Sequence, residues 1–200
     1  MLAVATRAQD KPLWNGKDLT GWTQVGPGKF VVENGRLKST GGMGLLYWNR
    51  GKVGNSVLRV VYRNETKESN SGVFIRIPEV PTELWMPVNK GYEVQIDDSG
   101  DEYHVTGVLY SLTKAKARPS RPGDWNTLEI ILEGPRTRVT VNGELVTAYS
   151  EGEPVPAKKE QWEPDRGPRP SEGHIGLQNH SDKDLVYFKE VSLRPLARPK

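Results

Sequence analysis

The feature that most constrains this fold is a series of short runs in which apolar and polar residues alternate, separated by turn signals. Residues 137–147 read TRVTVNGELVT and centre on Asn142 and Gly143, which predicts a hairpin. Residues 30–37 repeat the pattern around Asn34 and Gly35, and both residue types tolerate the positive φ of a type I′ turn. We therefore predict an all-β sandwich or a related all-β architecture.

The other strand candidates fill much of the chain, and no stretch shows a sustained helical period. They are residues 56–63, 71–77, 91–98, 106–111, 127–134, 174–180 and 186–193. Residues 78–90 contain three prolines, which exclude a central strand, so we predict a loop over one sheet edge there. Residues 151–172 are charged and rich in proline, which predicts a long irregular excursion.

The length of 200 residues suits one domain, which we place at residues 12–197. Residues 1–11 are polar and weakly patterned, and lack the full apolar segment of an export signal. We expect them to be disordered, or to be the remnant of a processed segment. No apolar run is long enough to span a bilayer, so we expect no membrane span.

Charge and composition exclude several classes of function. The formal net charge is only +3, and the Lys and Arg residues are scattered rather than gathered into a stripe, so we expect no nucleic-acid partner. The chain has no cysteine, which excludes disulfides, a thiolate nucleophile and Cys-ligated zinc. Its three histidines do not follow a metal-binding spacing, so we expect no metal and no cofactor. The oligomeric state is left open.

Residues 91–98, GYEVQIDD, carry the most chemistry of any predicted strand. Successive side chains of a strand point to opposite faces, so this run has an apolar face and a face with two carboxylates and an amide: Glu93, Gln95 and Asp97. We interpret this strand as the floor of a site. The alternative is a half-exposed strand whose acids contact only water, which antiparallel sheets allow.

The order of these blocks resembles the 3-keto-disaccharide hydrolase domain family. The blocks are LWNGKDLTGW, SGVFIR, GYEVQIDD, TGVLYS, GDWNTLEIILEG, VTVNGELV, HIGLQNHSD and VYFKEVSLRPL, which run from residue 13 to residue 196. The resemblance implies a concanavalin A-like lectin/glucanase fold, a two-sheet jelly-roll sandwich with a concave face that takes sugars. It also implies a bacterial protein that is periplasmic or secreted. The long excursions at residues 78–90 and 151–172 depart from the family pattern.

The resemblance implies cleavage of glycosides already oxidised to a ketone at sugar carbon 3. The ketone acidifies the carbon-2 hydrogen, a base removes it, and the enolate expels the group at carbon 1 before water adds back. This route needs a base, a proton donor and groups that stabilise the enolate oxygen. The candidates for proton transfer are Glu93, Asp97 and His180. Glu93 and Asp97 are four residues apart, or roughly 13 Å at ~3.3 Å per residue, which is too far for an ordinary two-carboxylate glycosidase.

His180 is the best acid/base candidate, because histidine titrates near neutral pH. It shares its strand face with His174 and Gln178. The alternative is a histidine at a strand end that bonds a loop carbonyl, and we favour such structural roles for His174 and His104.

The candidate substrate-binding residues are Arg76, Gln95, Tyr110, Gln178 and Trp85. Alternation places Arg76 beside Phe74, where a charge needs a carboxylate or ligand partner. It would hold the ketone or enolate oxygen, or pair with Glu93 or Asp97. The two glutamines suit sugar hydroxyls, and Tyr110 would donate a proton or stack on a sugar.

Aromatic side chains supply the remaining candidates. Trp85 is the preferred substrate platform, Trp48 is a weaker stacking candidate, and Trp125 fits the core better. Two rival functions stay open: a carbohydrate-binding module without catalysis and, ranked last, an ordinary glucanase of the same fold.

Overall fold

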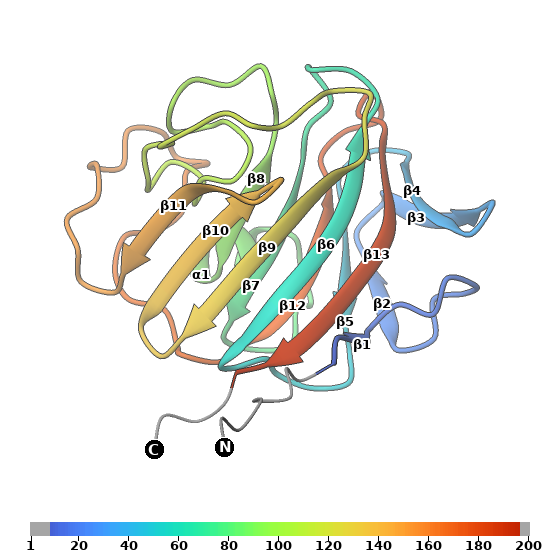
Figure 1. Ribbon diagram of the computed structural model, residues 1–200, viewed down its shortest axis with the longest axis horizontal. Coiled ribbons are helices and arrows are strands. Elements are labelled where there is room, and N and C mark those ends of the chain that lie inside the picture. The colour runs from blue at the N-terminus through green and yellow to red at the C-terminus, as the bar shows by residue number, and fades with distance from the viewer. Residues whose placement is uncertain (1–8, 197–200) are drawn as a thin grey trace, which may run out of the picture.

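Alternating apolar and polar side chains give each strand one face that favours burial, so such strands assemble into sheets that pack face to face. The computed structural model describes residues 9–196 and has this architecture, as Figure 1 shows. It consists of two antiparallel sheets, which confirms the predicted all-β sandwich. Among the described residues, no helix is long and apolar enough to cross a bilayer.

The larger sheet has the order β11-β10-β9-β6-β13-β4-β3, and β1 pairs with β13 beside this path. Its strands are β1 (Lys11–Pro12), β3 (Lys29–Glu33), β4 (Arg36–Thr40), β6 (Ser56–Asn64), β9 (Asn126–Glu133), β10 (Arg136–Val141), β11 (Glu144–Ser150) and β13 (Val186–Pro195). Residues 1–8 and 197–200, which include most of the predicted N-terminal segment, lie outside the described residues. Lys11 was excluded from the predicted domain, but it pairs with Leu193 and so belongs to the sheet.

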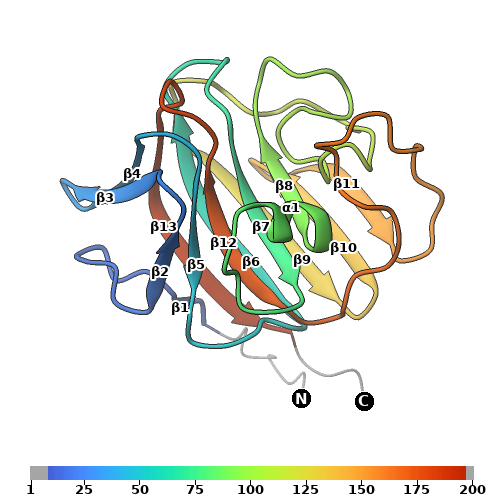
Figure 2. The same ribbon diagram turned by 180° about the vertical axis from the view of Figure 1, so that it is seen from behind.

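The smaller sheet has the order β2-β5-β12-β7-β8. Its strands are β2 (Trp22–Val25), β5 (Gly44–Trp48), β7 (Ser71–Ile77), β8 (Tyr92–Ile96) and β12 (His174–Asn179). The central strand β12 pairs with β7 and β5, so residues about 100 and about 130 positions apart in the chain become neighbours. Figure 2 shows the outer face of this sheet, with helix α1 (Trp85–Lys90) lying over it.

The main core lies between the two sheets and draws on both of them. Strand alternation predicts that six residues point inward: Val94, Ile96, Ile130, Leu132, Val139 and Val141. All six have 0% of their surface exposed, which confirms the predicted face of each strand. The predicted hairpin turns also form, since Asn34 has φ 51°, Gly35 has φ 69°, and Asn142 and Gly143 have φ 52° and 84°.

A bulge near the C-terminal end of β7 turns the last side chains of this strand to the face opposite to the one that alternation predicts. The pairing with β12 shifts register between His174 and Gly176, and Arg76 adopts φ 54°. An extra residue in one strand turns the following side chains to the opposite face. Arg76 therefore points into the sandwich, and Ile77 packs on the outer face with Phe74.

Of three segments between strands, two differ from the structure that the sequence predicts and one agrees with it. Residues 85–90 form helix α1 instead of part of a loop, because Pro87 lies in the first helical turn, where its missing N–H removes no helical bond. Residues 106–111 form turns and one isolated bridge at Leu109 rather than the predicted strand. Residues 151–172 contain no helix or strand, as predicted.

Candidate active site

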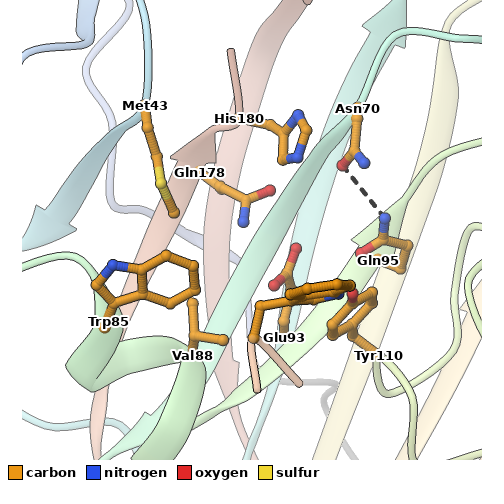
Figure 3. Close-up of a pocket in the computed structure, with 10 residues that line it drawn as sticks. Met43, Asn70, Trp85, Val88, Glu93, Gln95, Tyr110, Gln178 and His180 are labelled. Carbon is orange, nitrogen blue, oxygen red and sulfur yellow. Dashed lines mark hydrogen bonds between the residues drawn. The ribbon is translucent and has the colours of Figure 1, made fainter. Parts of the chain in front are cut away.

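The outer face of the smaller sheet carries a cavity of about 190 Å³ (Figure 3). Alternation along β8 and β12 turns the polar side chains to this face, while Val94, Ile96 and Leu177 enter the core. Helix α1 and the 151–172 excursion supply the walls. The lining residues are Met43, Asn70, Trp85, Val88, Glu93, Gln95, Tyr110, Trp162, Gln178 and His180.

Glu93 lies on the floor of the cavity with only 7% of its surface exposed. Burial raises the pKa of its carboxyl to about 8, and a hydrogen bond from Gln178 opposes the rise only in part. On the neighbouring strand, a Cβ added to Gly72 would lie 2.5 Å from Oε1 of Glu93. The missing side chain of Gly72 therefore makes room for this carboxyl.

His180 follows β12 and faces the cavity with its side chain 47% exposed. Its Nδ1 lies 2.8 Å from Oδ2 of Asp184, whose own side chain is only 10% exposed. Two donors hold this carboxylate: the backbone N–H of Asn70 at 2.8 Å and the hydroxyl of Ser181 at 2.5 Å. The imidazole is thus oriented by a fixed carboxylate, which leaves Nε2 for chemistry.

Two glutamines and an asparagine give the cavity a set of amides. Nε2 of Gln95 donates to Oδ1 of Asn70 at 3.2 Å. Oε1 of Gln95 and Oε1 of Gln178 are buried and have no hydrogen-bond partner among residues 9–196. A buried polar atom without a partner calls for an explanation, and hydroxyl groups of a ligand in the cavity would supply the missing donors.

Tyr110 forms one side of the cavity and is joined to β8 through its backbone N–H, which donates to the carbonyl of Glu93 at 2.9 Å. Burial, assisted by the charge of Glu93, raises the pKa of the Tyr110 hydroxyl to about 12. This hydroxyl therefore stays protonated at neutral pH and is available as a donor. The ring of His104 packs edge-on against it at 5.2 Å between centroids.

Two of the predicted site residues lie elsewhere. Asp97 comes just after β8, where its Oδ1 accepts hydrogen bonds from the backbone N–H and the hydroxyl of Ser99, and it does not line the cavity. The bulge turns Arg76 inward, and its guanidinium donates to Thr137 and to the carbonyls of Gly134, Arg136 and Pro170. The prediction that Arg76 joins Glu93 on one face is wrong, because alternation fails at a bulge.

The family model of the 3-keto-alpha-glucoside-1,2-lyase-like domain matches residues 9–194. The chain belongs to this family. A comparison with curated proteins gave no match.

Solved structures support the same fold for this lyase-like domain. A candidate glycosyl hydrolase from Parabacteroides distasonis is 24% identical, with 94% of this chain and all of that chain covered at a TM-score of 0.78. The carbohydrate-binding module CBM66 of Bacillus subtilis is 15% identical, with coverage of 87% and 95% and a TM-score of 0.61. A galectin-like protein of unknown function from Bacillus subtilis is 9% identical, with coverage of 97% and 98% and a TM-score of 0.61. At these identities the likeness shows a shared lectin-like fold.

The aromatic lining of the lyase-like domain differs in part from the prediction. Trp85 does line the cavity, but Trp162 joins it from the 151–172 excursion, where the sequence pattern carries no signal. Met43, Asn70 and Val88 were also missed. Trp48 packs against the core, and His174 packs edge-on against Tyr47 at 6.3 Å. The prediction that Trp125 fits the core is wrong, because this residue lies just before β9, is only partly buried and has the ammonium of Lys189 4.5 Å from its ring centroid.

Proposed function

We propose that this domain cleaves 3-keto glycosides by elimination followed by hydration. A base removes the carbon-2 proton, the bond between carbon 1 and the leaving oxygen breaks, and that oxygen takes a proton. Water then adds across the enone, with hydroxyl to carbon 1 and hydrogen to carbon 2, so that the net reaction is hydrolysis. The observation that carries this proposal is that one cavity is lined both by a buried carboxyl of raised pKa, Glu93, and by His180, whose ring is held by Asp184 behind it.

Glu93 has the properties expected of the base. A carboxylate whose pKa is about 8 holds a proton more strongly than an ordinary carboxylate, which favours abstraction from carbon. The burial that raises this pKa also shields the carboxylate from water. In this proposal Glu93 works in its deprotonated form and carries the carbon-2 proton after the first step.

His180 has the properties expected of the proton donor to the leaving oxygen. It lies at the exposed edge of the cavity, where the departing group reaches solvent, and Asp184 orients its ring. Tyr110 and the amides of Gln95 and Gln178 serve as hydrogen-bond donors for the enolate oxygen and the sugar hydroxyls. Among the described residues, none that line the cavity is Lys or Arg, so neutral donors take the place predicted for Arg76.

The test is turnover of a 3-keto-glucoside beside the same unoxidised glucoside. We expect release of the aglycone only from the ketone, because only the ketone acidifies carbon 2. In deuterated water, recovered substrate or product should carry deuterium at carbon 2. Glu93→Gln and His180→Ala should each lower kcat by about 10²–10⁴-fold, the usual contribution of a positioned acid or base. Equal turnover of both glucosides would reject elimination.

The pH profile supplies a second test of the base. Glu93 acts only when deprotonated, so kcat/KM should rise with pH up to about 8 and lose this limb in Glu93→Gln. A plateau already reached near pH 5 would point to a base of ordinary acidity.

A carbohydrate-binding module is the second candidate, favoured by two exposed tryptophans at the cavity, Trp85 and Trp162. In that case Glu93→Gln would leave sugar binding intact, and no glycoside would be cleaved. Export to the periplasm or the medium remains a proposal that rests on the family resemblance.

A further inference from the structure

Trp85 and Trp162 are two of the few large apolar side chains that are strongly exposed, at 47% and 49%. They come from α1 and from the 151–172 excursion, yet both line the 190 Å³ cavity. Both also line a second cavity of about 390 Å³, together with Asn89 and Gln161. We call this second space the tryptophan cleft. The two cavities share both tryptophans in their linings, so they adjoin each other.

The wall that carries Trp162 is fixed by a dense local network. Nη2 of Arg166 pairs with the buried Glu163 at 2.8 Å, and its other nitrogens donate to the carbonyls of Pro156 and Pro164. The carboxylate of Glu163 also accepts from the backbone N–H of Lys159 at 2.9 Å. These contacts tie together the backbone on both sides of Trp162.

The same excursion is tied to α1, which carries Trp85. Arg169 donates to the carbonyls of Asn89 and Gly91 at 2.8 and 2.9 Å. Lys90 forms an ion pair with Asp165 at 2.8 Å. These links join the two segments that carry Trp85 and Trp162, and so connect one wall of the tryptophan cleft to the other.

The volumes of the two cavities fit different parts of a substrate. Ligand pockets for whole small molecules usually measure roughly 300–1,000 Å³, so the 190 Å³ cavity around Glu93 suits one ring only. The group attached at carbon 1 must extend out of that cavity. The tryptophan cleft is the adjoining space, and Trp85 and Trp162 lead into it.

We propose that the tryptophan cleft is the leaving-group subsite and binds a hydroxylated six-membered ring, either a sugar or a phenol. The proposal rests on the proposed function. Indole faces pack well against flat or puckered rings, and the side-chain amides of Asn89 and Gln161 offer donors and acceptors for hydroxyls. Oδ1 of Asn89 has no hydrogen-bond partner within residues 9–196, so this acceptor is unused in the free protein.

The experiment compares kcat/KM on three ketones: methyl 3-keto-glucoside, p-hydroxyphenyl 3-keto-glucoside and a 3-keto-disaccharide of glucose. Trp162→Ala and Trp85→Ala are compared with Trp125→Ala, a change at a tryptophan just before β9 that lines neither cavity. We expect the first two variants to lose about 3- to 10-fold on the ring-bearing leaving groups, from stacking energies of roughly 0.5–1.5 kcal/mol. Both indoles also line the 190 Å³ cavity, so the methyl glucoside serves as the reference substrate. The ratio of kcat/KM on the ring-bearing ketones to kcat/KM on the methyl glucoside should fall about 3- to 10-fold in these two variants. The same ratio should stay within about twofold of the wild type in Trp125→Ala.

The two ring-bearing substrates also distinguish a sugar from a phenol as the preferred leaving group. An equal loss of kcat/KM on both means that the cleft recognises ring shape. A loss on only one of them means that the cleft prefers that ring. Equal losses on the methyl glucoside would overturn the proposal, because the tryptophans would then serve the reacting sugar or the fold. If the wild type cleaves none of the ketones, the proposed function fails. Titration with unoxidised cellobiose then tests the cleft independently of catalysis. If Trp162→Ala abolishes cellobiose binding, the cleft is still a ring-binding site. If binding is unchanged in Trp162→Ala, the proposal is rejected.

Discussion

At the scale of single residues, the role proposed for Glu93 conflicts with the stability of the fold. An unfolded Glu loses its proton near pH 4.5, whereas the folded protein keeps the proton until about pH 8. Between these values the folded state binds more protons than the unfolded state, so this residue lowers stability as the pH rises through that window. Each pKa unit corresponds to about 1.4 kcal/mol, which makes the effect large enough to measure.

We therefore predict that Glu93→Gln becomes more stable than the wild type as the pH rises from 4.5 to 8, by up to a few kcal/mol. Urea unfolding at several pH values gives the difference, in which contributions from all other groups cancel. A difference that does not change with pH would contradict the raised pKa.

In the proposed mechanism Asp184 is a positioning residue, because it contacts His180 and does not itself line the cavity. Replacing the acceptor carboxylate in Asp184→Asn should lower kcat by about 10²-fold, the low end for a positioned acid or base. A purely structural role would give the same loss in any background. We expect instead that Asp184→Asn costs nothing further in a His180→Ala protein, as measured by a double-mutant cycle.

At the scale of elements, the pairing of β7 with β8 leaves room for the Glu93 carboxyl. Phe74 is the direct partner of Glu93, and the carboxyl leans over Gly72, where any side chain would collide with it. Gly72→Ala should move the carboxyl, and a shift of about 1 Å costs roughly 10²-fold in rate. Gly54→Ala is the matched control, since its added Cβ would meet nothing closer than 3.5 Å. Equal activity of both variants would show that the position of the carboxyl tolerates this change.

At the scale of the whole molecule, one core joins the two sheets. Ile130 of the larger sheet and Val94 of the smaller sheet belong to the same buried cluster. Ile130→Ala should lower the free energy of unfolding by about 2–5 kcal/mol. Because the core is shared, tryptophan fluorescence and far-ultraviolet circular dichroism should report the same single transition in wild type and variant. Two separated transitions would mean that the sheets unfold independently.

Strand alternation could be predicted from the sequence, because it follows from backbone geometry within a few residues. It placed Val94 and Ile96 in the core and put Glu93, Gln95, Gln178 and His180 on one face, where the structure has them. The hairpin turns at Asn34 and Asn142 could also be predicted, because asparagine tolerates the positive φ values that these turns require. The sequence therefore determined the architecture and the polar floor of the site.

Only the tertiary structure decided what completes that floor. The bulge in β7 depends on its pairing with β12, about 100 residues away, and it moved Arg76 from the predicted site into the sandwich. Trp162 and Asp184 reach the site from irregular segments, whose course is set by long-range hydrogen bonds such as that between Asn70 and Asp184. Such contacts have no periodic trace in the sequence, because they form between segments that meet only once the sheets have packed.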